Sequence, residues 1–389
     1  MNINASSLPG NPPLIDYAVK GLEKCWLPQH GRWSHIYHLD GRAKPNESLP
    51  HSDVFYTLNT LLGLSRVPHI PSNLDLHAIF KHNVALLTRL PVAKYAFGMA
   101  LWTSGELGVE IPGHVLDAVD KILSEKSIWQ TFRAQDLGMM LSGVVAQAKR
   151  DPARWSALAA DLSAFLVTHY HCRSGLFFDA ARGIRRRFSS FATNTYLTLA
   201  CYHYGRFAND PRFIDMANAC ARKLIALQGP NGEWPWFFDT PNGRVVDFYE
   251  IYSVHQYGMA PAFLEYAGQH GVTEAREALI RGFRWVLGDN QLGRPMLMPD
   301  LQLTIRSQVR RSEIHTSKKR AIRAATNVLL RRSSSWADPA DIALRLECRS
   351  YELGWILWSF GSCSDFPELV NHPMFGAATR PPIKAFRSN

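Results

Sequence analysis

Apolar residues recur at spacings of three and four along most of the chain, which is the period of an amphipathic α-helix. Leu158, Leu162, Phe165 and Leu166 show this period in one segment. Two such segments joined by a turn form a pair, and the pair recurs six times. We predict first helices at about 14–26, 75–90, 112–127, 152–169, 210–228 and 273–288, and second helices at about 53–66, 92–106, 131–149, 190–207, 249–269 and 341–360.

The second helix of each pair is more apolar than the first and contains more small residues. Ala96, Gly98 and Ala100 lie in one second helix, and Gly138 and Gly143 in another. Helices that are apolar on nearly every side are buried. We therefore predict an all-α protein, an (α/α)6 toroid in which the second helices form an inner ring and the first helices an outer one.

Two segments outside the helices resemble each other. Gly175–Asp179 reads Gly-Leu-Phe-Phe-Asp, and Trp236–Asp239, 60 positions later, reads Trp-Phe-Phe-Asp. The second copy leads into Asn242-Gly243, a dipeptide typical of the tight turn in a β-hairpin. A weaker third copy lies at 33–42. We predict short β-hairpins between helices of a pair, at one end of the toroid.

The connections divide the chain into a toroid and its additions. We expect an N-terminal tail at 1–11, the toroid at 12–362 with a basic insertion at 289–340, and a C-terminal tail at 363–389. The long links all join a first helix to its second helix, so they emerge at one end of the ring. Long loops at one end of a scaffold usually build the functional face. We expect the site where the inner helices begin.

Asp247–Tyr257 is the richest polar segment at this end. Its Tyr252, His255 and Gln256 are spaced i, i+3 and i+4, so they share one face of the predicted helix. A tyrosine and a histidine in one cleft can divide acid and base roles across a sugar carbon. The start of a capped helix with buried, hydrogen-bonded polar groups gives the same pattern, and that structural interpretation stays open.

Carboxylates at this end offer a second chemistry. Asp247 or Glu250 is the candidate general acid, and Asp53 or Glu352 the candidate opposing base. Hydrolysis of a glycosidic bond needs such a pair on the two sides of the bond. In the last inner helix Tyr351 shares a predicted face with Glu347.

Aromatic and basic residues supply candidate substrate contacts. Trp234 and Trp236 lie in a loop, where they can stack on sugar rings or pack as a lid on the helix below. Arg133, Arg187 and Arg349 are candidate partners for a substrate carboxylate, although structural ion pairing is the commoner role of a single arginine. Tyr351 and Gln256 complete the predicted binding set.

Net charge adds one further expectation. The 389-residue chain carries +10, and much of the excess lies in 305–332. Such a run is usually a solvated face, and its alternatives are an acidic glycan, a membrane surface or nucleic acid. No nucleic-acid-binding motif accompanies it, so we expect no nucleic-acid partner and keep peripheral membrane contact through 305–332 open.

Several familiar motifs are missing from the sequence. His169 and His171 have no carboxylate partner nearby, and no dinucleotide or phosphate loop occurs, so we expect neither a metal nor a cofactor. The six cysteines are scattered, and we expect them to be reduced and buried. The chain has no secretory signal and no apolar run that could span a membrane, which favours a cytoplasmic location.

The six pairs, the Phe-Phe-Asp segments and Tyr252–Tyr266, which reads Tyr-Ser-Val-His-Gln-Tyr-Gly-Met-Ala-Pro-Ala-Phe-Leu-Glu-Tyr, resemble the six-hairpin glycosidase superfamily. That superfamily includes unsaturated glucuronyl hydrolases, and its toroid also occurs in polysaccharide lyases and sugar epimerases. The resemblance implies metal-free hydrolysis or elimination. Our first hypothesis is a carbohydrate-active enzyme that hydrolyses an acidic glycan with paired carboxylates. The alternatives are a uronate lyase or epimerase using Tyr252 and His255, and a non-catalytic toroid that binds glycan or protein partners.

Overall fold

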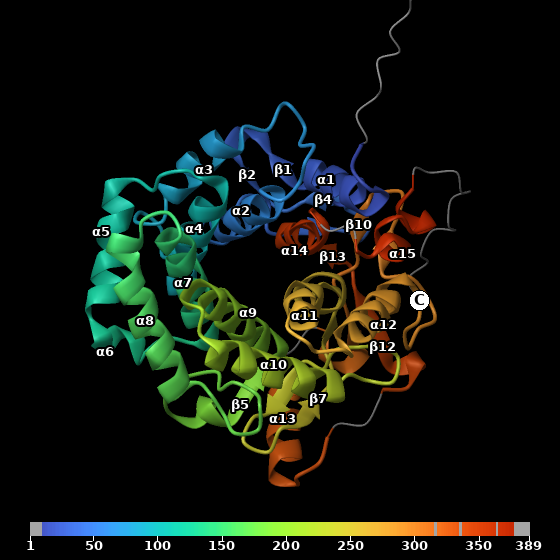
Figure 1. Cartoon of the computed structure of the whole chain (residues 1–389). Helices are drawn as coiled ribbons and strands as arrows, with labels where there is room; N and C mark the ends of the chain where they lie inside the picture. The colour runs from blue at the N-terminus through green and yellow to red at the C-terminus, as the bar shows by residue number, and fades with distance from the viewer. Residues whose placement is uncertain (1–9, 315–316, 334–336, 363–364, 377–389) are drawn as a thin grey trace, which may run out of the picture.

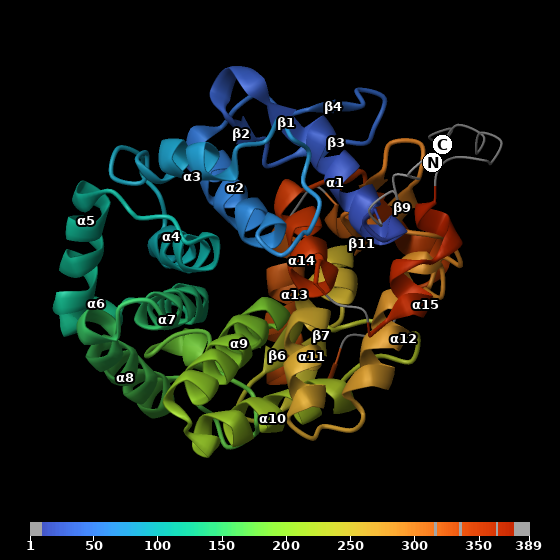
Figure 2. The ribbon, with the colours of Figure 1, turned by 45° about the horizontal axis from the view of Figure 1, so that its top comes forward.

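Twelve helices form two concentric rings in the computed structural model (Figures 1 and 2), which describes residues 10–314, 317–333, 337–362 and 365–376. The predicted (α/α)6 toroid is confirmed, with the second helix of every pair inside. The outer helices are α1 (Pro13–Cys25), α3 (Leu76–Val84), α5 (Gly113–Ser124), α8 (Pro152–His169), α10 (Pro211–Ala226) and α12 (Ala275–Leu287). The inner helices are α2 (Pro50–Leu64), α4 (Lys94–Leu107), α7 (Ala134–Ala148), α9 (Phe191–Ala208), α11 (Ala260–Gln269) and α14 (Ser350–Phe360).

Glycines allow the inner helices to approach closely. A Cβ on Gly98 of α4 would lie 2.5 Å from the Met140 nitrogen of α7, and one on Gly143 would lie 2.4 Å from the Gly98 oxygen. A Cβ on Gly63 of α2 would meet the backbone of Gly354 in α14. Any larger residue would push these backbones apart, so the small residues of the inner helices set the diameter of the ring.

Two inner helices begin later than predicted. Strand β8 (Ile251–Tyr252) precedes the fifth, which opens with a π-helical turn (His255–Met259) before α11. Strands β12 (Ile342–Arg345) and β13 (Glu347–Cys348) precede α14. Strand β11 (Ser307–Arg310) pairs with both β8 and β12, and this ladder overrides the local helical pattern.

This shift corrects two predictions about shared faces. Tyr252 lies on a strand, so it does not share a helix face with His255 and Gln256. Glu347 also lies on a strand, so it does not share one with Tyr351.

Short β-sheets lie at the end of the ring where the inner helices begin. The three-stranded sheets have the orders β12-β11-β8, β13-β3-β4 and β5-β6-β7, and two-stranded sheets join β1 to β2 and β9 to β10. The remaining strands are β1 (Trp26–Leu27), β2 (Arg32–Trp33), β3 (Tyr37–His38), β4 (Lys44–Pro45), β5 (Phe188–Ser190), β6 (Phe237–Asp239), β7 (Arg244–Asp247), β9 (Leu297–Met298) and β10 (Leu303–Thr304).

Two of the three predicted hairpins are confirmed. Strands β6 and β7 pair around the Asn242-Gly243 turn, where Gly243 has a φ of 57°. Strands β3 and β4 pair around the turn of the weakest copy, with β4 just beyond residue 42. The segment 175–179 forms an isolated bridge between Phe177 and His171 and no hairpin.

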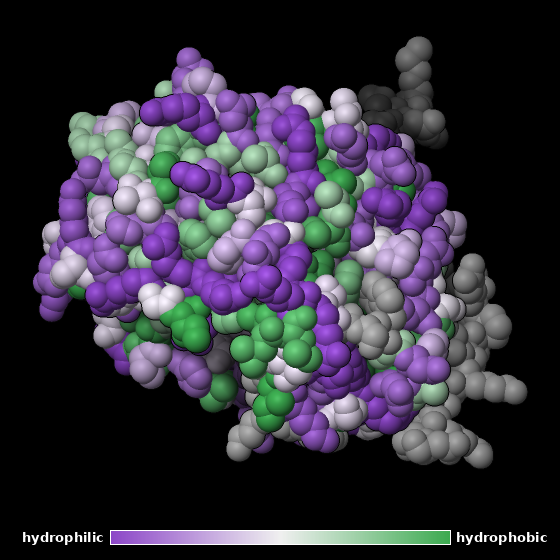
Figure 3. Space-filling view, turned by 90° about the horizontal axis from the view of Figure 1, so that it is seen from below, coloured by the Kyte–Doolittle hydropathy of each residue, from purple (hydrophilic) through white to green (hydrophobic). Residues whose placement is uncertain are grey.

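The basic insertion 289–340 is folded against the ring and includes helix α13 (Ser317–Leu329). The expectation of a solvated face is wrong for its buried Arg310 and right for the exposed Arg331. The side of the molecule on which α13 lies shows hydrophobic side chains gathered between hydrophilic ones (Figure 3). Ile322 and Leu329 are 66% and 82% exposed. Membrane contact through 305–332 stays a prediction.

The two ends of the chain close the ring. Helix α1 packs on α14, and the Tyr17 ring lies 5.3 Å from that of Phe375. The tail expected at 363–389 therefore starts with residues of the core, including helix α15 (Pro367–Val370). Residues 1–9 and 377–389 of the predicted tails lie outside the described part of the chain.

Two further expectations are that the cysteines are reduced and buried and that no segment spans a membrane. Cys25, Cys172, Cys201, Cys220 and Cys348 are free and buried, as predicted, and Cys363 lies outside the described residues. Within the described ranges, no helix has the length and hydropathy needed to cross a membrane.

Candidate functional site

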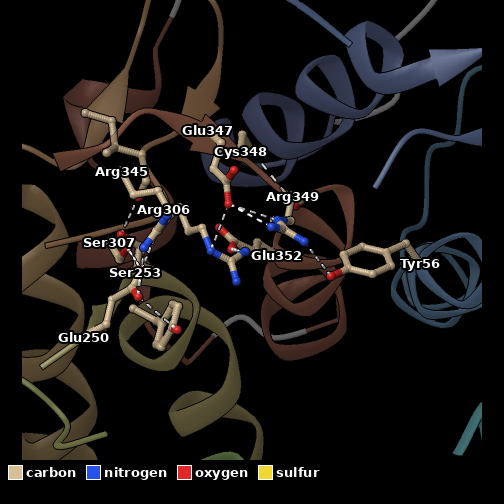
Figure 4. A network of polar contacts seen from close by, with 12 residues as sticks. Tyr56, Glu250, Ser253, Arg306, Ser307, Arg345, Glu347, Cys348, Arg349 and Glu352 are labelled. Carbon is tan, nitrogen blue, oxygen red and sulfur yellow. Dashed lines mark hydrogen bonds and ion pairs between the residues drawn. The ribbon is translucent and has the colours of Figure 1, made fainter. Parts of the chain in front are cut away.

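Arg306 lies at the centre of a polar cluster where the inner helices begin (Figure 4). Its Nε lies 3.1 Å from Glu347 Oε1, and its Nη1 donates to Glu352 Oε1 at 3.2 Å. Its guanidinium carbon lies 5.1 Å from the centre of the Tyr252 ring. The backbone fixes this position, because the Arg306 N–H donates to the Glu347 carbonyl and the Ser253 N–H donates to the Arg306 carbonyl.

Glu352, in the first turn of α14, has no exposed surface. Its Oε2 accepts a hydrogen bond from the Tyr257 hydroxyl at 3.1 Å. Burial raises the pKa of Glu352 to about 7, although Arg306 and Arg349 act in the opposite direction. This carboxyl can therefore hold or release a proton near neutral pH.

Glu250 is the most heavily paired carboxylate of the cluster. It accepts from Arg345 Nε at 2.8 Å, from Arg320 Nη1 at 2.9 Å and from the Ser307 hydroxyl. Burial alone would raise its pKa, but the hydrogen bonds from Arg345 and Ser307 outweigh burial and lower the pKa of Glu250. An ionised carboxylate held in this way cannot act as a general acid at neutral pH.

Arg349 connects the cluster to the first inner helix. Its Nε and Nη2 donate to Glu347 at 3.1 and 2.9 Å, and its Nη1 donates to the Tyr56 hydroxyl at 3.1 Å. The Tyr56 ring packs edge-on against Tyr351 at 4.8 Å, and burial raises the pKa of Tyr351. Arg349 thus makes the structural ion pair that is the commoner role of a single arginine, with Glu347 as its partner.

His255 and Tyr252 are neighbours, as the lyase hypothesis requires. Their ring centres lie 5.1 Å apart, and the Tyr252 hydroxyl donates to Glu250 at 3.2 Å. Burial and the nearby Arg306 lower the pKa of His255 to about 3, so its ring is neutral at physiological pH. Within the described chain its buried Nδ1 has no hydrogen-bond partner.

Two predicted catalytic carboxylates have structural partners. Asp247 is fully buried and accepts two hydrogen bonds from Arg310, at 2.8 and 3.1 Å. Asp53 accepts from the backbone and ring of His35, at 3.0 and 2.6 Å, and also from Ser48 and Leu49. Asp53 thus accepts four hydrogen bonds, and Asp247 also accepts from the Tyr249 N–H, so both carboxylates have structural roles, and Asp247 lies outside the Arg306 cluster.

The predicted aromatic platform is only half present. Trp234 is buried against Phe191, so the prediction that it is exposed for sugar stacking is wrong. Its loop folds inward because Gln256 Oε1 accepts from the Trp234 N–H, which also gives Gln256 a structural role. Trp236 is partly exposed, with Arg320 over its ring at 4.5 Å.

Arg133 and Arg187 lie at the same end of the ring but outside the cluster. Arg133 is the N-cap residue of α7, and its backbone N–H donates to Asp136. The Arg187 side chain is 49% exposed and lies 3.7 Å from Asp239. Both are accessible cations that lie around the cluster at this end of the ring.

No separate signal in the sequence marks the arginines of the insertion. Arg306 and Arg320 belong to the basic run, in which the buried members are not distinguished by neighbouring residues from the exposed ones. Arg306 immediately precedes a short strand of polar and β-branched residues, and this position is the one sequence feature that sets it apart from the rest of the basic run. Arg345, Glu347 and Tyr56 lie near predicted starts of inner helices, where the functional end was expected.

The cluster carries more positive than negative charge. Four guanidinium groups face three carboxylates, and one of these, Glu352, is partly protonated near pH 7. The positive ends of the inner helix dipoles point the same way. Within the described residues, His, Cys, Asp and Glu side chains do not gather in threes as metal ligands would.

Comparison with known proteins identifies relatives of the fold alone. No protein-family model matches the chain, and no curated protein matches it in sequence. A sugar epimerase from a ruminal bacterium superposes with a TM-score of 0.57 at 10% identity, covering 90% of this chain and 97% of that one. A possible GH105 member from Salmonella enterica gives 0.56 at 11% identity, covering 90% and 92%.

A third similar structure is the cellobiose 2-epimerase of Bacillus thermoamylovorans B4167, with a TM-score of 0.53 and 11% identity over 70% of this chain and 86% of that one. These likenesses establish the six-hairpin toroid fold expected from the resemblance. The similar structures are carbohydrate-active enzymes of different reaction types, and at this identity they do not transfer a reaction to the present chain.

Proposed function

We propose that this protein is a carbohydrate-active enzyme that binds a uronate-bearing glycan at the Arg306 cluster and transfers a proton at the carbon beside the uronate carboxylate. The surplus of guanidinium groups over ionised carboxylates carries the proposal. A carboxylate of the substrate would complete this charge balance. Epimerases are among the structures with the same fold, which agrees with this type of chemistry.

The contacts of the carboxylates favour proton transfer over hydrolysis. Hydrolysis needs a protonated acid and an opposing base or nucleophile, both within reach of one glycosidic bond. Asp247 and Asp53 are held by structural hydrogen bonds, Glu250 is held ionised by arginines, and Glu347 is paired with Arg306 and Arg349. Among the described residues of the cluster, Glu352 is then the carboxyl suited to exchange a proton, and one such group does not make a hydrolytic pair.

Arg306 and Arg349 are the proposed ligands of the substrate carboxylate, since their side chains are 14% and 20% exposed. Tyr56 is the proposed base. Its oxygen accepts from Arg349, and Tyr56 lies across the network from Glu250 (Figure 4), to which the Tyr252 hydroxyl donates.

The proposed step breaks the C5–H bond of a uronate. The proton goes to Tyr56, and the electron pair moves towards the carboxylate bound by the arginines. In epimerisation a proton returns to C5 from the opposite face, where Tyr252 and His255 are the proposed donors. In elimination the pair forms a C4=C5 double bond, the C4–O bond breaks, and the leaving oxygen takes the proton held by Glu352.

The test uses oligosaccharides of galacturonate, glucuronate and mannuronate, with neutral hexose oligosaccharides as the control, in deuterated water. Deuterium at C5 without cleavage indicates epimerisation, and ultraviolet absorbance of the new double bond indicates elimination. Tyr56→Phe should lower either rate at least ~100-fold. Tyr204→Phe, near the C-terminal end of α9 and away from the cluster, should leave both rates unchanged. New reducing ends without absorbance would instead establish hydrolysis and overturn the proposal.

A non-catalytic glycan-binding toroid is the second candidate, because nearly every carboxylate of the cluster is already paired with arginine. This candidate predicts that uronate oligosaccharides bind without deuterium exchange, absorbance or new ends. Binding should then weaken in Arg349→Ala and persist in Tyr56→Phe.

A further inference from the structure

A second hollow lies at the opposite end of the inner ring, where the inner helices finish. This rim cavity has a volume of about 480 Å³, and its lining includes Arg66, Lys149, Arg206, His203, Trp102 and Tyr266. Arg66 follows α2, Lys149 follows α7, and Arg206 lies in the last turn of α9. The rim cavity is separated from the Arg306 cluster by roughly the length of an inner helix, ~20 Å or more.

Three cations surround the rim cavity without ion-pair partners. In the described part of the chain, no carboxylate lies within 4.0 Å of the charged nitrogens of Arg66, Lys149 or Arg206. Glu265 acts on Arg66 and Arg206 at longer range, and burial raises the pKa of Glu265. Glu106 is the one carboxylate that lines the cavity.

Aromatic side chains form the wall between these cations. The His203 ring lies 5.1 Å from that of Trp102 and 5.6 Å from that of Tyr266. His203 Nδ1 lies 3.0 Å from Ser142 Oγ, which leaves Nε2 as a polar atom on the cavity side. Burial and the three cations lower the pKa of His203 far below its usual value, so its ring is neutral and offers a single hydrogen bond.

A structural role explains part of this charge. The carbonyl ends of helices attract cations, and Arg66 donates to the Trp358 carbonyl at 3.0 Å while lying over the Trp358 ring. In the described part of the chain, neither Lys149 nor Arg206 donates a side-chain hydrogen bond of this kind to a helix end, and both are exposed. Complementing the helix dipole needs no cavity and no aromatic wall, whereas a ligand site needs both.

We propose that the rim cavity is a second binding site, for a small molecule that carries a phosphate group on a sugar or similar ring. Two or three cations match the charge of a phosphate monoester, and Tyr266 with Phe207 offers apolar surface to the ring. A volume of about 480 Å³ accommodates a ligand of this size. The proposal does not depend on the chemistry at the Arg306 cluster.

Calorimetric titrations of the full chain at low ionic strength test this site. The probes are inorganic phosphate, glucose 1-phosphate and glucose, which separate binding of the anion alone from binding of the phosphorylated ring. The Lys149→Ala/Arg206→Ala double variant removes the two exposed cations. Lys20→Ala, on the outer face of α1, is the matched control, and circular dichroism checks that every variant is folded.

Glucose 1-phosphate should bind the parent chain and the Lys20→Ala control equally and bind the double variant at least ~10-fold more weakly, since hydrogen bonds to charged groups have about this effect. Glucose should bind at least ~10-fold more weakly than its phosphate. Equal affinity for inorganic phosphate and glucose 1-phosphate would overturn the role of the ring. No phosphate binding, or undiminished binding by the folded double variant, would overturn the site.

Discussion

The two ends of the inner ring handle positive charge in opposite ways. Where the inner helices begin, Arg306 and Arg345 are held by carboxylates of other segments, and Arg349 is held by Glu347, two residues away. Where the helices finish, Lys149 and Arg206 have no such partner in the described chain and line a cavity instead. Long connections supply partners at the first end, and short connections supply few at the second. The first end therefore orders its cations through ion pairs before any ligand binds, whereas the second leaves its cations without such pairs.

The sharpest way to break this comparison is Arg306→Ala. The change leaves Glu347 and Glu352 without their shared partner, and removing one partner of a buried ion pair typically costs ~3–5 kcal/mol. Urea denaturation should show this loss, whereas Arg154→Ala, which removes an exposed pair with Asp120, should cost less than ~1 kcal/mol. Equal losses would mean that the cluster is no more organised than the surface.

A second test measures the protonation of Glu352. Its pKa is raised to about 7 when folded, so the native state binds a proton that the unfolded state has already released. The stabilising contribution is complete below pH ~4.5 and is lost as pH rises through 7, with a slope of at most ~1.4 kcal/mol per pH unit. Relative to Glu352→Gln, the parent chain should therefore lose stability across this window.

The control for this titration is Asp161→Asn, which changes an exposed carboxylate on α8 and should leave the slope unchanged. A parent chain that runs parallel to Glu352→Gln from pH 4.5 to 7 would show that Glu352 is ionised throughout. The proton-exchange role of Glu352 would then be lost.

Tyr56→Phe should have a smaller effect on stability than on activity. The substitution removes one acceptor from Arg349, which keeps Glu347, so we expect a loss of ~0.5–1.5 kcal/mol. Urea denaturation with Tyr204→Phe as control measures it. A loss as large as that of Arg306→Ala would make Tyr56 a structural residue and weaken its assignment as a base.

The smallest effect is expected at the other end. Lys149→Ala removes an unpaired cation near the end of α7, which should cost less than ~1 kcal/mol through the helix dipole. Thermal denaturation at low and high salt measures the loss, which should shrink as salt rises. A large, salt-insensitive loss would place Lys149 in a buried ion pair and remove the contrast between the two ends.

The sequence predicts the two rings well because the periodic pattern that indicates each helix lies within the helix's own segment. The spacing of Leu158, Leu162 and Leu166 needs no information from elsewhere in the chain, and neither does the turn at Asn242-Gly243. The functional end could also be inferred, from the position of the long loops. These features depend on residues that are close together in sequence.

The cluster itself could not be assembled in this way. Arg306 meets Glu352 only because β11 pairs with β8 and β12, segments separated from it by tens of residues. A sequence analysis that does not know of this sheet predicts Tyr252 and Glu347 to be helical. It also predicts Asp247 to be a free acid, although Arg310 binds it. Trp234 likewise reads as a loop residue, because its burial depends on Gln256.

The seam of the ring joins the beginning of the chain to its end. The Tyr17 hydroxyl donates to the Leu303 carbonyl across 286 positions, and α1 also rests on α14 and Phe375. During synthesis, the apolar face of α1 therefore has no native cover until residues near 375 have left the ribosome. Helix α1 is made long before the segments that bury it, so the nascent chain exposes an aggregation-prone surface throughout that interval.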